Sequence, residues 1–106
     1  MAHSFMQTIE LALAPQQAEA AVYQALVTAG VTNVRGGGGV LEGGTSVGWT
    51  SWGEKVTATV GFGPRGSVVT LASTCSMPTQ LVDFGKNKKN VTKVVEALRG
   101  AAVPVL

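Results

Sequence analysis

Apolar residues recur at every second position in three stretches of the chain, which is the period of a half-buried β-strand. The stretches are Phe5–Leu13, Glu54–Phe62 and Ser67–Cys75. Val31–Arg35 and the glycine-rich Val40–Thr50 predict two weaker strands, because glycine inside a strand indicates a bulge or a close approach by another backbone. In the clearest strand, the positions expected to face the core are Val56, Ala58, Val60 and Phe62.

Two other stretches repeat their apolar residues with the period of an α-helix. The first begins at Pro15, where a missing N–H group costs nothing, and it ends before Gly30. The second carries apolar residues at i, i+3, i+4 and i+7 and ends near Gly100 and Pro104; these residues are Val91, Val94, Val95 and Leu98.

Turn residues connect the predicted strands. Gly63-Pro64-Arg65-Gly66 is typical of a hairpin, and the run from Gly36 to Gly39 predicts a flexible turn. No helix follows that glycine run, which disfavours a phosphate-binding loop. The order strand, helix, four strands, helix predicts an α+β fold, a curved antiparallel sheet of about five strands with two helices on one face. We expect residues 1–106 to form a single domain.

Composition and charge narrow the classes of function. With 45% hydrophobic and 13% charged residues, the chain is expected to be folded and to expose a rather apolar surface, suited to contact with itself, a partner or a membrane. The net charge of +2 is uneven: Asp83–Lys93 contains four lysines and one aspartate, a net +3, whereas the remainder has four basic and five acidic residues, a net −1. One short basic segment argues against nucleic-acid binding, which needs a broad basic face.

Neither a secretory signal nor an apolar run of the roughly 20 residues needed to cross a bilayer is visible, so a cytoplasmic location is expected. Groups for catalysis are sparse. His3 lies near the start of the chain, where a general base is not expected. Cys75 shares its face of the strand with apolar neighbours and is predicted to be a buried thiol. No group of residues has metal-ligand spacing. We therefore expect a non-enzymatic protein with no catalytic residues, no metal and no cofactor.

Two short motifs carry most of the remaining polar chemistry. The first is Ser51-Trp52-Gly53-Glu54, at the start of the clearest strand. The second precedes the last helix and contains Asp83, Phe84, Gly85, Lys86, Asn87, Lys89 and Asn90. With these motifs the chain resembles a family of small, largely uncharacterised bacterial domains, and its architecture looks like the TATA-binding-protein-like or helix-grip class. The resemblance implies a fold and no particular activity.

The two motifs suggest a polar latch between the sheet and the last helix. Glu54 shares its face with core positions, where a carboxylate needs a cationic or amide partner. Lys86 or Asn87 could supply that partner, and Asp83 could cap the turn or pair with a lysine. On this interpretation, carboxylates within the protein offset the lysines near the positive end of the helix.

Three alternatives remain at this stage. The backbone of the first helical turn, with Lys86 and Lys89, could bind a phosphate or a lipid head group. The space between helices and sheet could enclose a small apolar ligand, as in larger folds of this kind. Trp49 and Trp52 point to opposite sides of a strand, so one of them could form an exposed aromatic surface. The leading hypothesis is a binding or protein-interaction module that could form a homo-oligomer.

Overall fold

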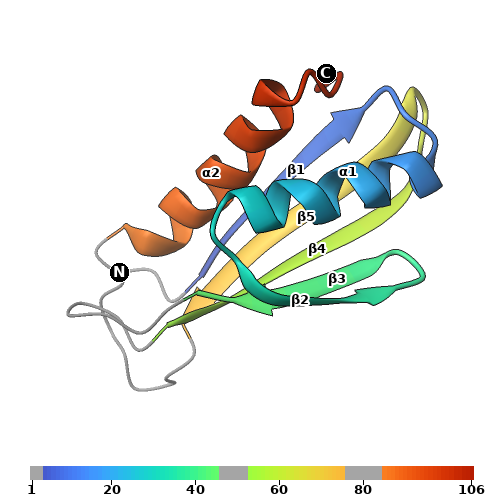
Figure 1. The fold of residues 1–106 in the computed structure, drawn as a ribbon. Helices are drawn as coiled ribbons and strands as arrows, with labels where there is room; N and C mark the ends of the chain where they lie inside the picture. The colour runs from blue at the N-terminus through green and yellow to red at the C-terminus, as the bar shows by residue number, and fades with distance from the viewer. Residues whose placement is uncertain (1–3, 46–52, 76–84) are drawn as a thin grey trace.

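The computed structural model describes residues 4–45, 53–75 and 85–106 of the chain (Figure 1). Two helices lie side by side across one face of a single antiparallel sheet, so that the domain has two layers. The elements in chain order are β1 (Ser4–Leu11), α1 (Pro15–Thr28), β2 (Thr32–Gly37), β3 (Val40–Gly44), β4 (Glu54–Gly63), β5 (Gly66–Cys75) and α2 (Lys86–Gly100).

The strands lie in the order β1-β5-β4-β3-β2, and every neighbouring pair is antiparallel. The four strands from β2 to β5 form a meander, and α1 carries the chain from β1 at one edge to β2 at the other. The predicted α+β class, the five-stranded sheet and the order of elements are confirmed.

Alternation along the two central strands explains why one face of the sheet is buried. In β4 the even-numbered residues from Glu54 to Val60 are buried, and in β5 the odd-numbered residues from Ser67 to Cys75 are buried. The valine, alanine and leucine residues among them form a hydrophobic cluster with the inward faces of α1 and α2. Leucine and valine fill the centre of this cluster, and the largest fully buried members are Leu11, Leu26, Leu41, Leu71 and Leu98.

Phe62 is an exception to the alternation, and its predicted position in the core is wrong. Its side chain is 89% exposed, whereas Val60, two residues earlier on the same side of β4, is only 8% exposed. The helices therefore cover β4 as far as Val60 and leave Phe62 exposed. Phe62 carries the helix-facing parity, but the helices leave its ring exposed.

The β2–β3 hairpin departs from a regular ladder at two points. The chain reverses at Gly38 and Gly39, which both have positive φ angles, so the turn is shorter than the predicted Gly36–Gly39 segment. Further along, the register shifts between Thr32 and Arg35, so that two residues of β2 lie opposite one residue of β3. Asn33 absorbs this bulge with a φ of 55°.

The two outer edges of the sheet are both modified. The end of β1 is covered by the C-terminal residues, since Leu11 pairs with Val105 and the N–H of Leu106 donates to the carbonyl of Glu10 at 2.9 Å. At the other edge, the bulge in β2 interrupts the regular row of backbone N–H and C=O groups that an edge strand presents. Such devices disfavour edge-to-edge pairing with another strand.

Gly43 of β3 lies opposite the bulge of β2. Substitution of Gly43 tests whether the bulge requires glycine at this position. A Cβ atom there would lie 2.6 Å from Cγ1 of Val31 and 2.7 Å from the carbonyl oxygen of Thr32, well inside contact distance. We expect Gly43→Ala to lower the free energy of unfolding by about 1–3 kcal/mol, the usual cost of overpacking. Gly61→Ala is the matched control, because a Cβ atom there meets nothing within 4 Å. Equal denaturation midpoints for the two variants would contradict this account of the bulge.

Candidate functional site

Glu54 opens β4 and faces the helices, as its even position in the strand requires. The residue is only 2% exposed. Gly53, which precedes it, has a φ of 93°, a conformation that glycine adopts without strain. The chain thus brings a carboxylate into the buried layer at the end of the sheet where β4 begins.

Hydroxyl and amide groups surround this carboxylate. Its Oε1 atom accepts hydrogen bonds from the hydroxyl of Thr45 at 2.8 Å and from Nδ2 of Asn90 at 2.9 Å. The Thr45 hydroxyl in turn accepts the backbone N–H of Glu54 at 2.8 Å. These bonds join Thr45, the residue that follows β3, to the start of β4. The bond from Asn90 joins the same carboxylate to α2.

The hydrogen bonds continue from Asn90 along the interface between α2 and β5. Nδ2 of Asn90 also donates to Oγ of Ser73 at 3.1 Å, and that hydroxyl donates to Oδ1 of Asn87 at 2.8 Å. Nδ2 of Asn87 lies 3.4 Å from the sulfur of Cys75 and donates to it. We call the six residues of this chain of hydrogen bonds the Glu54 network: Thr45, Glu54, Ser73, Cys75, Asn87 and Asn90.

The spacing of the residues explains why they meet. Asn87 and Asn90 are three positions apart, so they share one face of α2. Ser73 and Cys75 are two positions apart and share the buried face of β5, where Cys75 pairs directly with Glu54 in the ladder. The first turns of α2 thus present amides to a polar corner of the sheet.

Of the residues predicted for the latch, the structure places Glu54 and Asn90 in direct contact and adds Asn87 through Ser73. No ion pair joins Lys86, Lys88 or Lys89 to a carboxylate within the part of the chain that the structure describes. Asp83, Trp49 and Trp52 lie outside the described residues. The aromatic surface and the capping role of Asp83 therefore stay predictions.

Sequence reasoning missed Thr45 and Ser73. Ser73 did leave a signal, because it is a polar residue at an inward position of β5 between two apolar ones. Its hydroxyl connects Asn87 to Asn90. Thr45 follows the end of β3 and gave no periodic signal of its own.

The start of α2 combines a helix N-terminus with several lysines. Gly85 is the N-cap in the left-handed conformation, and it supplies no side-chain hydrogen bond. The first turn has no acidic residue, while Lys88 and Lys89 are exposed and Lys86 is half-buried. The predicted binding of a phosphate or lipid head group at this point stays a prediction.

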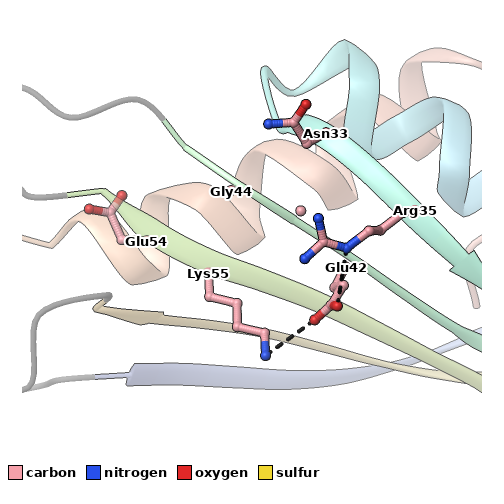
Figure 2. A pocket seen from close by; sticks show the side chains of 7 residues that line it. Asn33, Arg35, Glu42, Gly44, Glu54 and Lys55 are labelled. Atoms are coloured by element: carbon pink, nitrogen blue, oxygen red, sulfur yellow. Dashed lines mark hydrogen bonds and ion pairs between the residues drawn. The ribbon is translucent and has the colours of Figure 1, made fainter.

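A second polar cluster lies on the opposite face of the sheet (Figure 2). Glu42 of β3 pairs with Lys55 of β4 at 3.2 Å and with Arg35 of β2 at 3.4 Å, and the dashed lines in Figure 2 mark these contacts. The hydrogen bond and the charge of Lys55, supported by Arg35, lower the pKa of Glu42 below its usual value. The three side chains help to line a shallow cavity of about 360 Å³ at the bulge of β2.

Most members of the Glu54 network carry hydroxyl or amide groups, and the described residues offer no cluster of metal-binding side chains. Hydroxyl and amide groups do not gain or lose protons near neutral pH, and they make up most of the Glu54 network. Within residues 4–45, 53–75 and 85–106, no group of three or more histidine, cysteine or acidic side chains is placed to hold a metal ion.

Comparisons with known proteins gave no match: no family model, no curated protein and no solved structure resembles the chain closely enough to indicate a relationship. The resemblance to small bacterial domains therefore stays a prediction. Neither of the described helices is long and apolar enough to cross a membrane.

Replacing Glu54 by glutamine measures the importance of its charge. Oε1 receives two hydrogen bonds, and hydrogen bonds to an ionised acceptor are stronger than neutral ones. We expect Glu54→Gln to lower the free energy of unfolding by about 1–3 kcal/mol in chemical denaturation. Glu96→Gln, on the exposed face of α2, should change it by less than about 0.5 kcal/mol. A loss no larger than that of the control would show that the charge does not matter.

The pKa of Glu42 can be measured by carbon-detected NMR titration of its carboxyl group. Because the folded pKa is lowered, pairing stabilises the fold above the unfolded pKa, and this stabilisation is lost as the pH falls through the folded pKa. In Lys55→Met the titration midpoint of Glu42 should rise, since the largest cause of the shift is removed. An unchanged midpoint would rule out Lys55 as that cause.

Proposed function

We propose that this domain is a non-enzymatic interaction module that binds a second copy of itself through the uncovered face of its sheet. Both helices pack on the opposite face (Figure 1). No described element lies over the uncovered one, which we call the open face. It comprises the outward-facing residues of β1, β5, β4 and β3.

The composition of the open face is the observation that carries the proposal. Antiparallel sheets with one face in water usually alternate apolar residues inward and polar residues outward. Here the outward positions of β5 are Val68, Thr70, Ala72 and Thr74, and none of them is charged. Met6 of β1 and Val40 of β3 add exposed apolar side chains, at 66% and 51% exposure.

Charges on the open face lie toward its margins. Glu10 is on the edge strand β1 and pairs with Arg65 of the β4–β5 turn. Glu42 and Lys55 belong to the polar cluster at the bulge end of β2 and β3. Between them, Thr8, Thr70 and Thr59 stand side by side on three adjacent strands. A central region without charge and a rim with charges is the anatomy of a protein interface.

Several features favour a second copy as the partner. The C-terminal residues cover the end of β1 and a bulge distorts β2, and these features disfavour association through the edges of the sheet. Short side chains at its centre allow another sheet to approach to the roughly 10 Å spacing of packed sheets. A second copy supplies such an uncharged surface, and twofold symmetry lets one patch serve both partners.

Light scattering on purified protein tests the proposal. We expect the wild type to be a dimer whose fraction rises with concentration. Thr59→Arg, at the centre of the open face, should weaken association about tenfold or more, because each interface would bury two unpaired charges. Gln17→Arg adds the same charge on the exposed side of α1 and should associate like the wild type.

Thermal melting of both variants would confirm that each is folded. A wild type that stays monomeric at high concentration would overturn the proposal. Equal weakening by the two arginine substitutions would also overturn it, since the effect would then come from charge alone and not from the open face.

A further inference from the structure

A groove runs between α1 and the β2–β3 hairpin, on the helix side of the molecule and away from the open face. Two cavities of about 270 and 380 Å³ make up the groove, and both are lined by Gln16 and Glu19 of α1. Tyr23 lines one end and Phe62 the other. Figure 1 shows the start of α1, the β2–β3 turn and the end of β4 at the same end of the sheet. We call this the α1 groove.

Glu19 gives the α1 groove its charge. Among the described residues that line it, Glu19 is the one charged side chain, and no cation faces it there. Its Oε1 atom accepts the backbone N–H of Gly39 at 2.6 Å, which anchors the half-buried carboxylate on the hairpin. A carboxylate that is already anchored loses less side-chain entropy when it binds a cation.

The two ends of the α1 groove are aromatic. Phe62 is 89% exposed, and Tyr23 is 38% exposed. Between them the turn residues Gly38 and Gly39 bring backbone, without side chains, to the surface of the groove. Gly39 cannot be replaced without strain, because its φ is 95° and a Cβ atom would lie 2.8 Å from the carbonyl oxygen of Val60.

We propose that the α1 groove binds an extended peptide segment of a partner protein, in which a basic side chain is flanked by apolar ones. The basic side chain pairs with Glu19, and the apolar side chains contact Phe62 and Tyr23. Charge complementarity supports this occupant, since the groove is acidic at its centre and apolar at its ends.

The length of the groove fits the spacing of such a segment. From Glu19 to Tyr23, α1 rises about 6 Å at ~1.5 Å per residue, and Phe62 lines the other of the two cavities that Glu19 lines. In an extended peptide, residues i, i+2 and i+4 point to the same side and span about 13 Å. The motif is therefore apolar-x-basic-x-apolar.

NMR titration of isotope-labelled protein tests the proposal with defined probes. The first probe is the capped pentapeptide acetyl-Leu-Ser-Arg-Ser-Leu-amide, and the second has glutamate in place of arginine. Argininamide alone is the third probe and represents a free small cation. We expect the arginine peptide to cause saturable amide shifts at Gln16, Glu19 and Gly39, while the glutamate peptide causes none.

Two variants separate the contributions of charge and apolar contact. Glu19→Gln retains an oxygen that can accept the Gly39 N–H and should bind the arginine peptide about fivefold more weakly, as expected for loss of a partly exposed ion pair. Phe62→Ala should also weaken binding, and it should leave the fold intact because the ring is exposed. Glu96→Gln on α2 is the control and should bind like the wild type.

The proposal is overturned by any of three results. These are the absence of saturable shifts with the arginine peptide, equal binding of the glutamate peptide, and argininamide binding as tightly as the peptide. The last would indicate a small-cation site. The α1 groove and the open face lie on different sides of the sheet, so a dimer that binds no peptide and a monomer that does are distinguishable outcomes.

Discussion

A buried carboxylate determines how the last helix sits on the sheet. Glu54 is almost fully enclosed, and an ionised group in such a place is costly unless hydrogen-bond donors surround it. One donor, Thr45, comes from the sheet side, and another, Asn90, comes from α2. Because Asn90 must reach the carboxylate, the rotation of α2 about its axis is fixed, and the valines that follow are directed into the core. The inward face of α2 is thus polar in its first turns and apolar afterwards.

The same constraint fixes the register of β4. A shift of this strand by one residue would move Glu54 to the open face and bring Lys55 into the core. Ser73 and Asn87, both fully buried, would then lose the polar surroundings that link them to the carboxylate through Asn90. With both helices placed on one face, the opposite face is left uncovered. The proposed binding surfaces follow from this division, with one on the open face and one beside α1.

The periodic parts of the sequence predict the fold well, and the corner that holds the network is harder to predict. Alternation of apolar and polar residues predicted the strands, and the spacing of Val91 to Leu98 predicted the last helix. Burial of one face of a strand or helix imposes these periods on the sequence directly. Phe62 shows the limit of that reasoning, since parity says which side a residue faces but not how far the helices extend. Glu54 could be named as a candidate because a carboxylate at an inward position needs a partner. The sequence suggested Lys86 or Asn87 as that partner, and the structure shows a hydrogen bond from Asn90, another residue of the same motif. The pairing of the asparagine amides with the oxygens of Glu54 and Ser73 depends on the rotation of α2 about its axis. No local sequence pattern predicts that rotation.

The most direct test of this account is a double-mutant cycle between Glu54 and Asn90. The free energy of unfolding would be measured for the wild type, Glu54→Ala, Asn90→Ala and the double variant, because alanine at position 54 removes the oxygen that accepts from Asn90. The account predicts a coupling energy of about 1–2 kcal/mol, as expected for groups in one hydrogen-bond network. Losses that simply add within about 0.3 kcal/mol would show that the carboxylate and the amide act independently, and would contradict the account.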